Sequence, residues 1–185
     1  MNIKNTEELM DYVSHGNKVK YLFFWGHRKP KKGVSKSCLS QWYDSPFESD
    51  SNRFLTAEHF MMYKKAKLFG DDSAAEKLLT VTDPGAAKAI GRQIEGFDQE
   101  LWDKKRFDIV VQANLAKFKD NHALKEFLLN TGDRVLVEAS PVDRIWGVGL
   151  AEDDERCQNP NKWKGHNLLG FALMAVRSRL REGGT

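Results

Sequence analysis

The spacing of apolar side chains predicts a mainly helical chain. From Thr56 onward, apolar residues recur at intervals near three and four, as they do on one face of an α-helix, and Thr56 itself is a suitable N-cap for the first of these segments. The same spacing predicts five more helices, over residues 72–79, 83–90, 99–118, 123–129 and 168–180. Basic residues near the end of the last segment suit the negative end of a helix dipole.

Alternating or aromatic-rich patterns predict a small β component. Residues 134–139 (RVLVEA) alternate as a strand does, residues 19–25 are rich in aromatic side chains, and residues 38–43 (CLSQWY) suggest another strand. A short helix, capped by Asn5 or Thr6 and ended near Gly16, precedes them. We find no repeat or linker. The prediction is therefore an α-rich α+β fold in a single domain over residues 1–185, with residues 161–164 as polar loop.

Composition supports a globular protein without disulfides or membrane segments. Of the 185 residues, 41% are hydrophobic and 11% aromatic, which suffices for one core. The two cysteines, Cys38 and Cys157, lie far apart and outside any CxxC motif, so we expect reduced thiols in a cytoplasmic protein. The polar N-terminal segment is unlike a signal peptide, and the aromatic and apolar run at residues 21–25 is far too short to cross a bilayer.

The charge balance favours a small anionic ligand. The 29 basic and 26 acidic residues leave a formal charge of +3, which does not demand a nucleic-acid partner. Residues 28–36 (RKPKKGVSK) form a basic loop with proline and glycine. This loop is either a solvated connection or a lid that touches phosphate.

Standard cofactor and metal motifs do not fit. A dinucleotide fingerprint starting at Gly147 and Gly149 would need a third glycine where Glu152 stands, and no phosphate-binding P-loop motif is present. The five histidines form no H-x-x-x-H pair with a third ligand. We therefore expect neither a metal ion nor an organic cofactor.

Glu58 and Lys65 are the first candidate site residues. Seven residues separate them, so they lie on one face of a helix, roughly 10 Å apart, and could hold opposite ends of one ligand. Structural interpretations exist as well: an acid in a first helical turn suits the helix dipole, and a helix lysine is commonly solvated. The other polar and aromatic candidates that folding could gather are Arg92, Trp102, Asp143, Trp146, Gly147, Gly149 and Asn167.

The order of these pieces resembles the YbiA-like, or NADAR, family. AEHFMMYKKA is followed by AIGR, by the Trp102 helix running to AKF, by LVEAS, by DRIWGVGL and by NLLGFALMAVR. The resemblance covers about residues 21–180, and the combination is specific although each piece alone is weak. It implies the mainly helical fold of that family, with a small β element.

The resemblance also implies an activity and roles for the candidate residues. Family members are N-glycosidases that act on phosphoribosylamino-pyrimidine intermediates of riboflavin synthesis, or that remove ADP-ribose from guanine. By resemblance, Glu58 is the acidic residue of the site and Asp143 a second carboxylate. Both are candidate catalytic residues: Glu58 would stabilise the charged ribose and activate water, and Asp143 would bind ribose hydroxyls or protonate the leaving base. Trp102 and Trp146 would wall the site, and Lys65 and Arg92 would hold phosphate. Gly147 and Gly149 would let the backbone approach the substrate, and Asn167 would bind the sugar.

Two departures from the family pattern leave the substrate open. Val148 stands where the best-known bacterial member has an acid, and Ala139 where it has a histidine. The leading hypothesis is an N-glycosidase of riboflavin intermediates, and the second a guanine-specific ADP-ribose hydrolase acting on nucleic acid or nucleotide. The third is a non-catalytic nucleotide-binding module. None of them requires a protein partner or a membrane.

Overall fold

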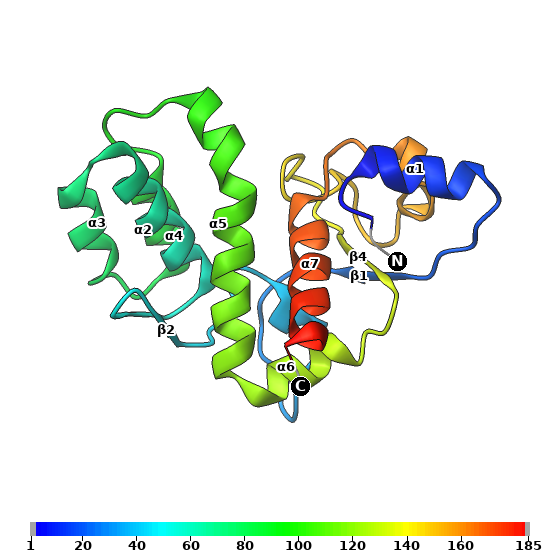
Figure 1. Cartoon of the computed structure of the whole chain (residues 1–185), viewed down its shortest axis with the longest axis horizontal. Coiled ribbons are helices and arrows are strands. Elements are labelled where there is room, and N and C mark those ends of the chain that lie inside the picture. Colours follow the sequence, from blue (N-terminus) through cyan, green and yellow to red (C-terminus); the bar gives the residue numbers. More distant parts are fainter. Residues whose placement is uncertain (1–2, 184–185) are drawn as a thin grey trace.

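The chain folds around one long central helix. The computed structural model describes residues 3–183 and confirms the α-rich α+β fold with a small sheet. Figure 1 shows α5 running through the middle, with α2, α3 and α4 on one side and α7, α1 and two strands on the other. The helices of the described part are α1 Thr6–Ser14, α2 Ala57–Phe69, α3 Asp72–Leu78, α4 Pro84–Gly91, α5 Gln99–Asp120, α6 His122–Leu129 and α7 Leu168–Glu182.

Local capping residues explain why the helix starts were predictable. The Asn5 side chain accepts a hydrogen bond from the Glu8 amide at 2.8 Å, and Thr56 Oγ1 accepts one from the His59 amide at 3.4 Å. Three aspartates cap later helices in the same way: Asp71, Asp83 and Asp98. Gly70, with a left-handed φ of 75°, ends α2. The observed helix ends therefore fall within two residues of the predicted ones.

Two of the predicted strands pair, and a hairpin was not predicted. β1 (Tyr21–Phe24) and β4 (Val135–Glu138) form a parallel pair in which Phe24 lies opposite Glu138. β2 (Phe47–Ser49) and β3 (Asn52–Phe54) form an antiparallel hairpin. Its turn residues Asp50 and Ser51 both take positive φ angles. Aspartate tolerates this conformation, but the sequence pattern did not predict it.

The predicted strand over residues 38–43 is wrong. Its first part belongs to the 3₁₀ helix η1 (Lys36–Leu39). The carbonyl oxygens of Cys38 and Ser40 accept hydrogen bonds from Lys117 Nζ at 2.6 and 2.9 Å, so a buried side chain from α5 takes the place of a neighbouring strand. The predicted loop at residues 161–164 also overlaps a 3₁₀ helix, η3 (Pro160–Lys162), which follows η2 (Glu155–Gln158).

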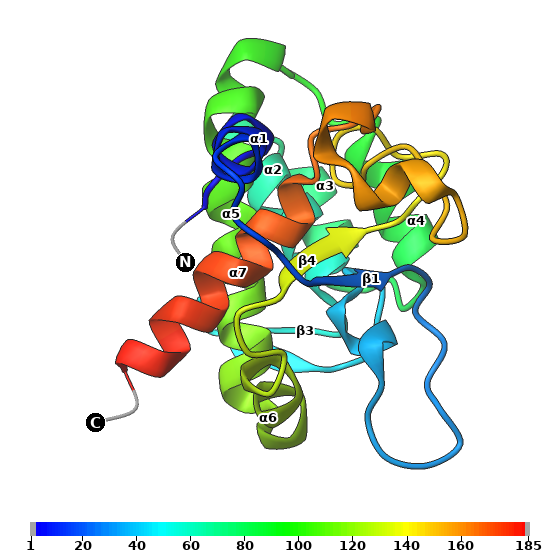
Figure 2. The ribbon, with the colours of Figure 1, turned by 90° about the vertical axis from the view of Figure 1, so that its right-hand side faces the viewer.

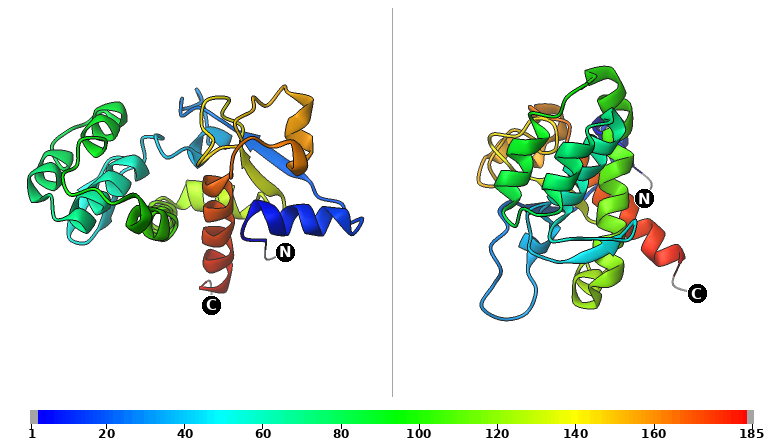
Figure 3. Two further views of the ribbon diagram at one scale, coloured as in Figure 1. Left: turned by 90° about the horizontal axis from the view of Figure 1, so that it is seen from above. Right: turned by 90° about the vertical axis from the view of Figure 1, so that its left-hand side faces the viewer.

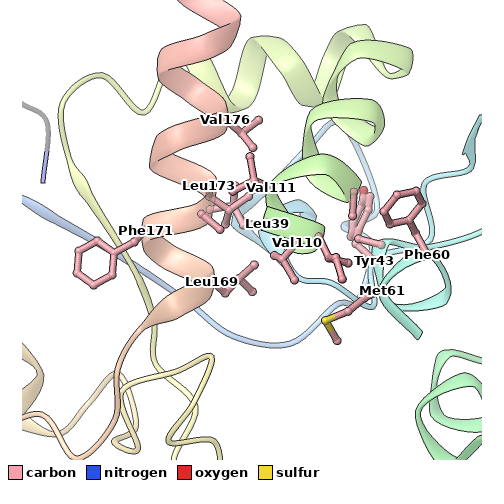
Figure 4. Packing of buried hydrophobic residues seen from close by; sticks show 14 of the residues in the cluster. Leu39, Tyr43, Phe60, Met61, Val110, Val111, Leu169, Phe171, Leu173 and Val176 are labelled. Atoms are coloured by element: carbon pink, nitrogen blue, oxygen red, sulfur yellow. The ribbon is translucent and has the colours of Figure 1, made fainter. Parts of the chain in front are cut away.

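The core packs on both sides of α5. Figure 4 shows Leu169, Leu173 and Val176 of α7 beside Val110 and Val111 of α5. Tyr43, Phe60 and Met61 lie toward the α2 side of the same core, whereas Leu39 lies beside Leu173. Seen from above in Figure 3, α2, α3 and α4 form a group separated by α5 from β1 and β4. No helix among residues 3–183 has the length and apolar character needed to span a bilayer.

Candidate active site

Glu58 is a buried carboxyl group at the start of α2. Only 3% of the residue is exposed, and its backbone amide donates to the Gln41 carbonyl at 3.0 Å. Its Oε1 atom is buried without a hydrogen-bond partner among the described residues. An unpaired buried carboxyl oxygen is costly to the fold, and such groups are common where substrate or a proton will bind.

The surroundings of Glu58 place its titration near neutrality. Burial raises the pKa of Glu58 to about 7. The positive charge of Lys88 and the polar side chain of Trp42 oppose this rise, as does Arg92 more weakly, whereas the Asp143 carboxylate adds to it. Near neutral pH the group can therefore hold or release a proton.

Glu138, a half-buried residue with a buried carboxyl oxygen, is a second acidic group that was not predicted from the sequence. It is the last residue of β4, and its Oε2 atom is buried without a hydrogen-bond partner among the described residues. Burial raises its pKa to about 8, Asp143 and Glu58 add to the rise, and Lys88 opposes it. The available signal was a glutamate ending a strand whose other residues, 135–137, are apolar and buried. Burial and these negative neighbours therefore all favour the protonated form of Glu138.

Asp143 organises the loop that follows β4. Its Oδ1 atom accepts hydrogen bonds from the amides of Ile145 and Trp146, both at 2.8 Å. A Cβ on Gly147 would lie 2.8 Å from the Glu138 carbonyl, and Gly149 has a φ of 68°, so both positions favour glycine. The loop therefore closes tightly onto the end of β4 and holds the Asp143 carboxylate beside the two glutamates. Trp146 is half-buried there.

Asn167 is built into the fold beside Glu138. It is fully buried, with its side chain accepting from the Glu138 amide and donating to the Leu136 carbonyl, each at 2.9 Å. These bonds tie the start of α7 to the end of β4. The expected sugar contact stays a prediction, but the geometry gives Asn167 a clear role in positioning Glu138.

Lys88 and Trp42 join the carboxyl groups and were not predicted. Lys88 Nζ lies 5.8 Å from the centroid of the Trp42 ring, and its charge acts on both buried glutamates. Arg92, the exposed C-cap of α4, acts on Glu58 from the same helix. Five separate segments thus meet around Glu58, which explains why sequence spacing alone did not reveal the set.

Lys65 and Trp102 meet in a different cluster. Lys65 Nζ donates to the Gly91 carbonyl at 2.7 Å and lies 4.3 Å from the Phe97 ring centroid and 5.5 Å from that of Trp102. Burial lowers the pKa of Lys65. Lys65 and Glu58 therefore have different neighbours. Helix α4 contributes to both sets, with Gly91 bonded to Lys65 and Lys88 acting on Glu58. Within residues 3–183, no three His, Cys, Asp or Glu side chains are grouped so that they could hold a metal ion.

Carboxyl groups whose pKa values burial raises toward neutrality, beside a lysine and an indole, are typical of acid–base enzyme sites. The chain belongs to the NADAR domain family, whose model matches residues 23–181. An E. coli protein, YbiA, solved by NMR, shares the fold with a TM-score of 0.73 at 24% identity, over 91% of this chain and 89% of that one.

Three relatives place the chain in an enzyme class. N-glycosidase R617 of Acanthamoeba polyphaga mimivirus is 40% identical over 88% of this chain and 98% of its own length. N-glycosidase Npun_R5314 of Nostoc punctiforme is 33% identical, over 78% and 86%. N-glycosidase YbiA of Escherichia coli is 30% identical, over 73% and 76%. The chain is accordingly a hydrolase acting on N-glycosyl bonds.

The raised pKa of Glu58 predicts a specific pH dependence of stability. Between the ordinary value of 4.5 and about 7, the folded protein holds a proton that the unfolded chain has lost, so the free energy of unfolding falls as pH rises. Glutamine at this position does not titrate, so the free energy of unfolding of Glu58→Gln lacks this decrease. We expect the stability of the variant relative to wild type to increase by up to about 3 kcal/mol between about pH 5 and pH 8.

Urea unfolding of both proteins across this range measures the effect. The comparison isolates Glu58 because every other titrating group is present in both proteins. A stability difference that stays constant with pH would show that Glu58 titrates normally.

Proposed function

We propose that the chain hydrolyses the bond between ribose C1 and nitrogen in phosphoribosylamino-pyrimidine intermediates of riboflavin biosynthesis. The observation that supports this most is the pair of buried glutamates, Glu58 and Glu138, beside Lys88. Relatives that are named N-glycosidases support the type of bond that is cleaved. The two free, buried cysteines suit a cytoplasmic location, which is part of the same proposal.

The two glutamates suit the two halves of the reaction. When the C1–N bond breaks, its electrons go to the departing nitrogen, which takes a proton, while positive charge develops on the ribose. Glu138 holds its proton to higher pH and is our candidate acid. Lys88 and Trp42 both lower the pKa of Glu58 and so favour its ionised form. Glu58 is therefore our candidate for stabilising the charged ribose and accepting a proton from the attacking water. Asp143 would then bind ribose hydroxyls.

The surrounding residues suit a phosphorylated substrate. Arg92 is exposed at the end of α4 and can form a bidentate contact to phosphate, with Lys88 adding positive charge. Trp146 would flank the base or the ribose. Lys65 and Trp102, the second cluster, would hold the far end of the substrate. No metal or organic cofactor enters this mechanism.

A guanine-specific ADP-ribose hydrolase is the second candidate, favoured by the position of the basic loop. Figure 2 shows residues 28–36 extending from the body of the molecule. At the base of this loop, the His27 ring lies 5.6 Å from that of Trp42, and Lys29 pairs with Asp44 at 2.7 Å. A nucleic acid whose modified base reached Glu58 would therefore pass the loop.

Neutralising the loop separates the two candidates. When Lys29, Lys31 and Lys32 are changed together to glutamine, we expect the rate of cleavage of a small pyrimidine substrate to change by less than about twofold. The phosphate group of that substrate would bind Arg92 and Lys88, not the loop. Cleavage of an ADP-ribosylated oligonucleotide would weaken by about tenfold or more and lose part of its salt dependence. Initial rates at several salt concentrations measure both.

Product release measured by chromatography tests the proposal. Wild type and Glu58→Gln are compared on freshly generated phosphoribosylamino-pyrimidine and on a guanine-ADP-ribosylated oligonucleotide. Cleavage of the pyrimidine alone, lost in the variant, is the expected result. Cleavage of the oligonucleotide alone would establish the second candidate. Binding of ADP-ribose without turnover of either substrate would support a non-catalytic module, a reading motivated by the buried, apolar Val148 and Ala139.

A further inference from the structure

A polar stripe on the buried face of α5 plays no part in the chemistry described above. Asn114, Lys117 and Asn121 follow one another at intervals of three and four, which places them on one side of the helix. Asn114 and Lys117 are both fully buried. All three donate hydrogen bonds to the chain between Cys38 and Pro46. A stripe of this kind holds one segment of backbone against the helix.

Lys117 is the most unusual member of the stripe. Its Nζ donates to the carbonyls of Cys38 and Ser40 at 2.6 and 2.9 Å, and it lies 5.7 Å from the Tyr43 ring centroid and 5.2 Å from that of Phe118. Burial lowers the pKa of Lys117 to about 7. Burying an amine among carbonyls and rings is expensive compared with an apolar side chain of similar size, which points to a role beyond packing.

The segment that Lys117 holds leads directly to Glu58. Asn114 Nδ2 donates to Gln41 Oε1 at 2.7 Å, and the Gln41 carbonyl accepts the Glu58 amide at 3.0 Å. The side chain of the next residue, Trp42, lowers the pKa of Glu58 and so lies near its carboxyl group. Residues 38–42 therefore lie between α5 and Glu58. The Gln41 carbonyl accepts from the Glu58 amide, and the Trp42 side chain acts on the Glu58 carboxyl group.

We propose that Lys117 and Asn114 are positioning residues, which hold residues 38–42 so that Gln41 and Trp42 keep the Glu58 carboxyl group in its working place. The kinetic consequence rests on the proposed function, because it requires Glu58 to take part in turnover. The structural coupling between Lys117 and Glu58 does not rest on it.

Lys117→Met tests the coupling, since methionine keeps much of the volume and removes the donors. The titration of Glu58 is followed by NMR in protein labelled with ¹³C-glutamate, with the signal assigned from Glu58→Gln. We expect the Glu58 titration to move by at least about half a pH unit. The charged groups around Glu58 are Lys88 and Arg92 on α4, Asp143 in the loop and Glu138 on β4, and all are unchanged.

The matched control is Asn121→Ala, because Asn121 donates to the Pro46 carbonyl at 3.1 Å, outside residues 38–42. It should leave the Glu58 titration in place. An unmoved titration in folded Lys117→Met would overturn the proposal, and so would an equal movement in the control. Should Lys117→Met not fold, Asn114→Leu, which removes the bond to Gln41, gives the same test.

A double-mutant cycle on turnover provides the second readout. Lys117→Met should lower kcat by about tenfold with little change in KM, and most of this loss should vanish in a Trp42→Phe background. Independent, additive losses would contradict action through Trp42. If wild type turned over no N-glycosyl substrate, the proposed function would fail while the NMR titration still decided the coupling.

Discussion

Glu58→Gln is expected to lower kcat/KM for N-glycosyl cleavage by about 10³-fold while substrate binding is retained. Glutamine matches glutamate in size but carries no negative charge and accepts no proton from water. The change should therefore remove stabilisation of the charged ribose in the transition state and spare the ground-state complex. Steady-state kinetics, with binding of a product such as ribose 5-phosphate measured by calorimetry, separate the two effects.

The chain offers a matched control for this substitution. Glu7 also stands in the first turn of a helix, α1, but its side chain is exposed, and it is not among the charged groups that act on Glu58 or Glu138. Glu7→Gln should leave the rate within about twofold, because exposed helix charges contribute little. An equal rate in Glu58→Gln and wild type would remove Glu58 from the mechanism.

Glu138→Gln should produce the second largest loss, about 10²-fold in kcat/KM. An amide at this position cannot donate a carboxylic proton to the departing nitrogen, although it fills the same space at the end of β4. The loss should be smaller for substrates whose base leaves readily without protonation, because these need the acid least. Rates on a series of substrates with different leaving groups measure this dependence.

Glu48 provides the control for Glu138. It also lies on a strand, β2, but is exposed and outside the carboxyl cluster. Glu48→Gln should behave as wild type. A loss in Glu138→Gln that does not depend on the leaving group would assign Glu138 a structural or electrostatic role instead of proton donation.

The sequence predicted the parts of this fold that depend on local signals. Helices were recognisable because their caps, such as Asn5 and Thr56, and their apolar spacing lie within a few residues of each other. The segment after residue 36 was misread because its backbone partner is Lys117, some eighty residues away, and no local pattern records such a partner. The β2–β3 hairpin was missed because each strand has only three residues.

The candidate site was predictable only in part, for a related reason. Glu58 was a candidate because of its helix position, and Asp143 and Arg92 were polar candidates to which the family resemblance gave roles. The structure brings the charges of all three together. Glu138, Lys88 and Trp42 belong to the same cluster, but their environment arises from tertiary packing between α2, α4, β4 and the 38–42 segment. A buried carboxyl group cannot be told from an exposed one until the surrounding elements are placed.

The pH dependence of kcat/KM in wild type and Glu138→Gln tests the central claim, that a buried pair of carboxyl groups performs the hydrolysis. Wild type should give a bell-shaped profile with both limbs near neutrality, because the pair titrates at about 7 and about 8. The variant should lose the alkaline limb, which reports the acid, and keep the acidic one. Profiles of the same shape in both proteins would contradict the assignment of Glu138 as the acid and of the pair as the catalytic unit.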